Sequence, residues 1–238
     1  MKRPRILLVA PFTELEWTIK PQLEEWADVA SFDPPRLGVE SSRQLSPITD
    51  RGLEELDRRG WDEFFLAVDG FGTEAAIAIA LERRDAVLGL ALGHATLSQR
   101  RTGERPPVNP DVWAALTQLL RQDRAEFGRH ALVQVTGGSI DEELAQAMIE
   151  RLPIDLDEAW ETLTAEVEFG GRLRELARPL LLAKHEGCLL HTSEGYEDAV
   201  AAFPDAMTAS VPERCCGSPA FGDALQGFCE SVIGTGER

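Results

Sequence analysis

The sequence predicts an α/β protein in which a parallel sheet of about six strands is flanked by helices. The first observation is an apolar run of strand length, Phe64–Val68, which meets a glycine-bearing turn and leads at once into an Ala/Ile-rich helical segment. The second is that further apolar runs of strand length alternate with helical segments. The third is a long stretch between two strands that holds helical patterns only. Together these features predict a sheet domain interrupted by a helical insertion.

Strands and helices are expected in a regular order along the chain. Before the insertion, strands are expected at 5–10, 27–32, 64–68 and 86–92, and helices at 18–26, 53–59 and 73–84. After the insertion, strands are expected at 179–184 and 207–211, and helices at 196–203 and 219–232. This spacing is typical of a parallel sheet that is covered by helices on both faces.

The insertion is expected to span residues 105–173, so that the sheet domain comprises residues 1–104 and 174–238. Asn109 can cap a helix whose first position is Pro110. Gly170-Gly171 is expected to close the last helix of the insertion.

Composition excludes several classes of partner. The chain has 24 basic and 41 acidic residues, and a net charge of −17 argues against nucleic acid or an anionic membrane as partner. The basic start of the chain precedes an apolar run of only five residues, which indicates a core strand rather than a secretory signal. Four cysteines in 238 residues do not make a disulfide scaffold, so a reduced, cytoplasmic protein is expected. The oligomeric state is open, with a homodimer among the options.

The turn from Val68 to Gly72 resembles the nucleophile elbow of the α/β-hydrolases, a small-x-Ser-x-Gly turn between a strand and a helix. Gly70 stands where the serine belongs, so the elbow lacks its hydroxyl. Glycine adopts the positive φ of this turn without the strain that other residues bear there. The resemblance covers most of the chain in order. It implies an α/β-hydrolase fold in which the helical insertion is the lid.

The resemblance also places the other two members of the Ser–Asp–His triad. Cys188 stands about where the acid is expected, and Cys216 about where the histidine is expected. A shift of one or two places after Lys184 would instead bring His185 or Glu186 to the acid position. Because serine attack requires a hydroxyl, a base and a group that orients the base, the sequence argues against a serine hydrolase.

Asp69, His94, Cys188 and Cys216 are the candidate catalytic residues of a non-serine mechanism. Some relatives use an aspartate nucleophile, but with Asp69 in that role the bulky Phe71 would occupy a position that needs a small residue. The other interpretation of Asp69 is a carboxylate favoured by a helix N-terminus. His94 follows a strand, so it is expected at the carboxyl edge of the sheet as a general base, a ligand-binding group or a loop histidine bonded to backbone.

The two cysteines have several interpretations. Cys188 and Cys216 lie on loops that are expected to approach the elbow. They are a thiol nucleophile, ligands of a soft metal together with His185 or His191, a disulfide, or inert core residues. Because the sequence has no Cys-x-x-Cys pair, no metal site and no cofactor are predicted.

The leading hypothesis is a triad-less pseudo-enzyme that binds an apolar small molecule under the lid, with a binding or regulatory role. The residues expected to contact this ligand are Pro11, Phe12, Gly70, Phe71 and His94. The alternative is a hydrolase, lyase or isomerase that uses Asp69, His94 or the cysteines. A third hypothesis is a structural partner protein whose pocket is filled by side chains. Convergence of Asp69 and His94 beside a pocket would favour the enzyme.

Overall fold

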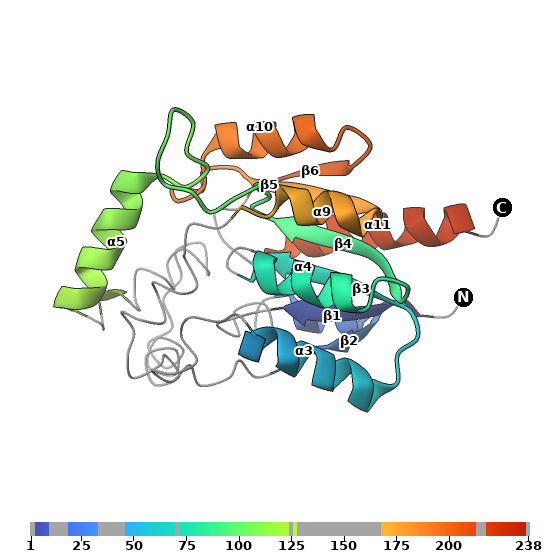
Figure 1. The fold of residues 1–238 in the computed structure, drawn as a ribbon. Coiled ribbons are helices and arrows are strands. Elements are labelled where there is room, and N and C mark those ends of the chain that lie inside the picture. Colours follow the sequence, from blue (N-terminus) through green and yellow to red (C-terminus); the bar gives the residue numbers. More distant parts are fainter. Residues whose placement is uncertain are drawn as a thin grey trace.

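Six parallel strands form one sheet in the part of the chain that the structure describes (Figure 1). The structure is a computed structural model, and it describes residues 3–9, 19–32, 46–69, 72–123, 126–127, 168–212 and 218–236. The strands are β1 (Arg5–Val9), β2 (Asp28–Ala30), β3 (Phe64–Asp69), β4 (Val87–Gly93), β5 (Leu180–His185) and β6 (Met207–Val211). Their order across the sheet is β2-β1-β3-β4-β5-β6, and every neighbouring pair is parallel.

Helices cover both faces of this sheet (Figure 1). One face carries α3 (Ser46–Arg59), α4 (Thr73–Glu82), α9 (Gly170–Leu176) and α10 (Ser193–Ala202). The other face carries α2 (Lys20–Glu24) and α11 (Pro219–Gly236). Helix α5 (Pro110–Gln122) lies apart from the sheet, and its Leu120 packs with Phe127 in a small separate core.

The central strand β3 is buried along its whole length, and its side chains alternate between the two faces. Leu66 and Val68 pack under α3 and α4, whereas Phe65 and Ala67 pack under α2 and α11. This alternation directs the next residue, Asp69, toward the face covered by α11. The hydrophobic pattern of the strand therefore fixes where the first candidate site residue points.

The predicted fold class is confirmed, and most predicted elements lie within a few residues of their observed bounds. Helix α3 begins at Ser46, well before the predicted start at residue 53. Asn109 caps α5 as predicted, because its Oδ1 accepts hydrogen bonds from the backbone N–H groups of Asp111 (3.1 Å) and Val112 (3.3 Å). Within the described ranges, no helix is both long and apolar enough to cross a membrane.

The expectation for Gly170-Gly171 is wrong, because these glycines begin helix α9 instead of ending a helix. The residue before them, Phe169, donates its backbone N–H to the Leu97 carbonyl at 3.0 Å, and Gly170 donates to the same carbonyl at 3.1 Å. Both bonds tie the start of α9 to the segment that follows β4. Helix α9 runs through residue 173 and packs against α4, and most of the lid, residues 128–167, lies outside the described residues.

The core under α11 makes a quantitative prediction for Phe65. Its ring is fully buried and meets Phe228 edge to face, with ring centroids 5.9 Å apart and planes at 73°. We expect Phe65→Ala to lower the free energy of unfolding by about 3–5 kcal/mol, because it removes apolar contacts and leaves a cavity. Urea unfolding measures this change. Leu189→Ala, at a side chain that is 54% exposed, is the control and should change stability by less than about 0.5 kcal/mol. Equal effects of the two variants would contradict the assignment of this core.

Candidate functional site

The candidate site lies at the carboxyl ends of β3, β4 and β5, which adjoin one another in the sheet. Asp69 ends β3, Gly93 ends β4 and His185 ends β5, while His94 follows β4 directly. Asp69 and Gly93 are paired in the register of β3 and β4. The carboxyl edge of a parallel sheet is where such folds place their ligands.

The buried carboxylate of Asp69 is the centre of the site. Its Oδ1 lies 2.7 Å from Nδ1 of His94, and its Oδ2 lies 3.1 Å from Nε2 of His185. The contact with His185 is at ion-pair distance but lacks hydrogen-bond alignment, so His94 is the better-bonded partner. Burial raises the pKa of Asp69, but the two imidazoles lower it more, and the pKa falls well below its usual range. Asp69 is therefore an ionised acceptor, and Nδ1 of His94 donates to it.

His94 is held in one orientation by backbone and ring contacts as well as by Asp69. Its φ of +49° lies in the left-handed region, which is uncommon for a residue with a side chain and often occurs at functional sites. Its ring stacks on His185, with centroids 4.0 Å apart and planes within 5°. Since Asp69 occupies Nδ1, Nε2 is the nitrogen that can serve a reacting group.

Cys188 brings a thiol to this histidine. It lies in the turn after β5, where its Sγ is 3.6 Å from Nδ1 of His191 and accepts the backbone N–H of His191 at 3.3 Å. The Sγ atom and one ring nitrogen each of His94 and His191 lie within 4.8 Å of one another. The site therefore joins a carboxylate, an imidazole and a thiol in that order.

The surroundings favour the thiolate form of Cys188. Burial raises the pKa of its thiol, but hydrogen bonds and positive charge from His191 and His94 lower it, and the balance is a pKa of about 4. Cys229, by contrast, is buried in α11, and burial together with the charge of Glu230 raises the pKa of its thiol. Of these two cysteines, Cys188 is the reactive one.

A small polar cavity adjoins the cluster. Its volume is about 50 Å³, and the lining includes His94, Lys184, His185, Cys188, His191 and Tyr196. A water molecule occupies about 30 Å³ in the liquid, so this cavity suits a water or a small reacting group rather than a large apolar molecule.

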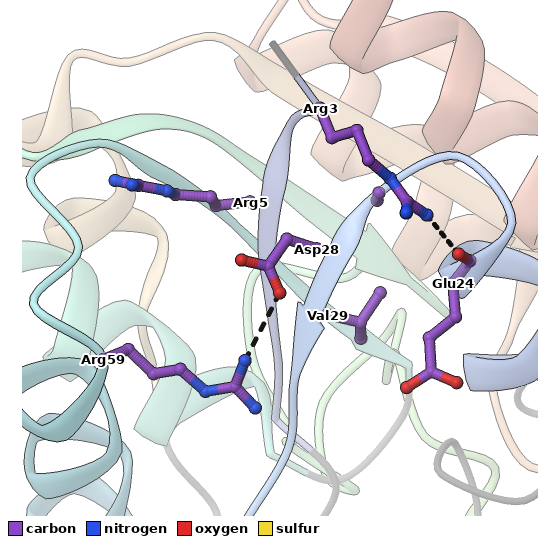
Figure 2. Close-up of a pocket in the computed structure, with 7 residues that line it drawn as sticks. Arg3, Arg5, Glu24, Asp28, Val29 and Arg59 are labelled. Atoms are coloured by element: carbon purple, nitrogen blue, oxygen red, sulfur yellow. Dashed lines mark hydrogen bonds and ion pairs between the residues drawn. The ribbon is translucent and has the colours of Figure 1, made fainter.

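A larger cavity of about 640 Å³ lies at the opposite edge of the sheet, where β1 and β2 begin (Figure 2). Its charged groups are already engaged. The Arg3 guanidinium donates to the Glu24 carbonyl, and Arg59 pairs with Asp28 at 3.3 Å. The Arg5 guanidinium lies 6.0 Å from the centroid of the Trp61 ring. This cavity offers no nucleophile and base in contact, so the His94 cluster is the better candidate site.

The structure brings together three of the four residues that the sequence nominates for catalysis: Asp69, His94 and Cys188. The fourth, Cys216, lies outside the described residues, as do four of the five expected ligand contacts, Pro11, Phe12, Gly70 and Phe71.

Two histidines of the cluster have roles that the sequence reasoning did not assign. His185 and His191 were considered only as partners of a soft metal. A visible signal was the Cys-x-x-His spacing from Cys188 to His191, which places two donors within one turn. For His185 the signal was its place two residues after Ala183, on the face of β5 that points toward α11.

Solved structures resemble this chain over nearly its whole length. A hydrolase from Oleispira antarctica matches with a TM-score of 0.68 at 12% identity, covering 98% of this chain and 90% of that protein. An enol-lactonase from Burkholderia xenovorans matches with a TM-score of 0.68 at 12% identity, covering 98% and 92%. An esterase from Rhodococcus matches with a TM-score of 0.65 at 17% identity, covering 97% and 89%. The chain has the α/β-hydrolase fold.

The resemblance to α/β-hydrolases is one of structure. No sequence-family model matches the chain, and no curated protein matches it in sequence. At identities of 12–17% the likeness shows the α/β-hydrolase fold alone. The chemistry of this α/β-hydrolase fold therefore has to be argued from Asp69, His94 and Cys188 themselves.

Gly93 provides a test of the Asp69 environment. A Cβ atom at Gly93 would lie 2.1 Å from Oδ1 of Asp69, so Gly93→Ala must displace the carboxylate that holds His94. We expect a loss of about 1–3 kcal/mol in the free energy of unfolding. Urea unfolding measures it, with Gly171→Ala as the matched control, since nothing lies within 4 Å of a Cβ there. A Gly93→Ala variant as stable as the wild type would contradict the close packing of Asp69.

The pKa of Cys188 makes a second prediction. A free thiol has a pKa near 8.5, so its alkylation slows roughly a hundredfold between pH 8 and pH 6. Alkylation of Cys188 by iodoacetamide should stay nearly constant over this range and fall only as the pH approaches about 4. Cleavage after Lys184 and Arg214 isolates Cys188 from the other three cysteines, so mass spectrometry of peptide 185–214 measures its rate. Denatured protein is the control, and a rate that follows the free-thiol profile in the folded protein would contradict the prediction.

Proposed function

We propose that this chain is a thiol-dependent acyl hydrolase in which Cys188 is the nucleophile, His94 the general base and Asp69 the group that orients His94. The observation that carries the proposal is the chain of contacts from Asp69 Oδ1 to His94 Nδ1 (2.7 Å) and on to the Cys188 thiol beside the same ring. A nucleophile, a base and an orienting group are recognised by geometry, and their order along the sequence is free to vary.

The chemistry follows from these contacts. The Cys188 thiolate attacks the carbonyl carbon of an ester, a carbon–sulfur bond forms, and the carbon–oxygen bond to the leaving alkoxide breaks. His94, which has taken the thiol proton, gives it to the leaving alcohol. Water then attacks the thioester and passes a proton to His94, the carbon–sulfur bond breaks, and the carboxylic acid leaves. Asp69 remains ionised throughout and stabilises the imidazolium of His94.

The fold supports this assignment by where it places each group. The nucleophile elbow of α/β-hydrolases follows the strand that matches β3, and that strand ends here in a carboxylate, Asp69. The thiol of Cys188 stands on the turn after β5, where the resemblance expects the acid. In this proposal the two positions have exchanged roles, since the nucleophile now lies on the acid turn. The solved relatives are described as a hydrolase, an esterase and an enol-lactonase, which supports acyl chemistry by analogy.

The size and polarity of the cavity favour a small acyl group. The space beside Cys188 is about 50 Å³, and Lys184, His191 and Tyr196 contribute polar groups to its lining. Short-chain esters and thioesters are therefore the substrate class we propose.

The second candidate is the pseudo-enzyme that binds an apolar small molecule without turnover. Gly70 in place of the elbow serine supports it, because the usual nucleophile is missing. The two candidates differ in one observable, because only the hydrolase acylates Cys188.

Turnover of p-nitrophenyl acetate by the purified chain tests the proposal. We expect a rate above that of buffer, lowered at least a hundredfold by Cys188→Ser or His94→Gln and about 10²–10⁴-fold by Asp69→Asn. Quenching the reaction in acid should trap an acetyl group on peptide 185–214. Cys229→Ala, at a buried cysteine of α11, is the matched control and should keep the wild-type rate.

Two results would overturn the proposed hydrolase. One is turnover at the buffer rate with no acetyl group on peptide 185–214, which would favour the binding protein. The other is turnover that persists in Cys188→Ser, which would assign the reaction to another residue.

A further inference from the structure

The donor atoms around Cys188 form a set that differs from what the hydrolase needs. Three donors converge there, namely Sγ of Cys188 and one ring nitrogen each of His94 and His191, all within 4.8 Å of one another. Acyl transfer needs only one imidazole as base. The second imidazole, His191, therefore remains to be explained.

The geometry of two of these donors already suits a tetrahedral metal. Bonds of about 2.3 Å from zinc to sulfur and about 2.1 Å from zinc to nitrogen, at a tetrahedral angle, place the two ligand atoms about 3.5 Å apart. Cys188 Sγ and His191 Nδ1 are 3.6 Å apart. Thiolate and imidazole ligands select soft or borderline cations over magnesium or calcium.

The third donor has the support that metal-binding histidines normally receive. A histidine that binds zinc through one nitrogen usually donates its other N–H to a carboxylate or a carbonyl group. His94 donates Nδ1–H to Asp69 at 2.7 Å, which leaves Nε2 to point at a metal. Three protein ligands with a carboxylate behind one of them are also the pattern of zinc sites that keep one coordination position for water or substrate.

We infer that His94, Cys188 and His191 bind a borderline divalent cation such as Zn²⁺, and that the bound cation masks the Cys188 thiolate. The masking of turnover rests on the proposed function of the site, whereas the binding of the cation does not. A cation bonded to Sγ and to His94 would occupy both the nucleophile and the base. The same three side chains would then hold either an active thiol or a closed metal site, depending on the supply of metal.

Cobalt binding to the metal-free chain tests this inference. Co²⁺ bonded to a thiolate gives a charge-transfer band, and its visible bands are intense when it is tetrahedral. We expect one equivalent of Co²⁺ to produce both signals and one equivalent of Zn²⁺ to abolish them. Cys188→Ala and His191→Ala should each weaken binding at least tenfold, and Cys229→Ala should bind like the wild type. Thermal unfolding of each variant without metal checks that it folds.

Protection of the thiol provides a readout that does not depend on turnover. One equivalent of Zn²⁺ should slow alkylation of Cys188 in peptide 185–214 at least tenfold, and a chelator should restore the rate. Ester turnover should fall and recover in parallel.

The possible failures of the two proposals can be told apart. Turnover by the metal-free chain without any cobalt signal would overturn the metal inference and leave the hydrolase standing. A cobalt signal with Zn²⁺ protection but no turnover would support the metal site and overturn the hydrolase. A cobalt signal that survives in Cys188→Ala but is lost when Cys215 and Cys216 are both changed to serine would place the metal elsewhere and overturn the inference.

Discussion

The buried carboxylate of Asp69 is the interaction on which the rest of the site depends. An ionised carboxylate with no exposed surface is costly unless it is paired, and here His94 and His185 supply the partners at 2.7 and 3.1 Å. Its position in turn requires the absence of a side chain at Gly93, the neighbouring residue on β4. Because Asp69 fixes the ring of His94, it also fixes which nitrogen of that ring can serve Cys188. One carboxylate thus sets the chemistry of an imidazole and, through it, of a thiol.

The parallel sheet supplies this geometry at little conformational cost. Adjacent strands β3, β4 and β5 end at one edge, so that Asp69, His94 and His185 converge although they are far apart in the chain. The α/β-hydrolase fold uses the same edge for its catalytic groups. In this chain the carboxylate stands on the elbow strand and the thiol on the turn after β5. The fold therefore provides positions, and the side chains placed there decide the reaction.

The thiolate of Cys188 connects the two proposals. The neighbouring imidazoles that lower the pKa of this thiol make it both a better nucleophile and a better metal ligand. A nucleophile needs an open sulfur and a base, whereas a metal site uses both of them as ligands. His191 distinguishes the two uses, because it adds a third donor that the acyl transfer reaction does not require. A site of this kind couples catalysis to the availability of metal through one sulfur atom.

The sequence by itself determined the sheet, the order of its elements, and Asp69, His94 and Cys188 as candidates. Those features are local, because strand-length apolar runs, glycine turns and strand ends can each be recognised within a few residues. It failed at Gly170-Gly171, where a hydrogen bond to Leu97 begins a helix, and at the role of His191. Only the tertiary structure could show that Asp69 bonds His94 across 25 residues and that Cys188 joins them from the turn after β5. Distances between loops at the edge of a sheet depend on strand register and twist, and no local pattern encodes them.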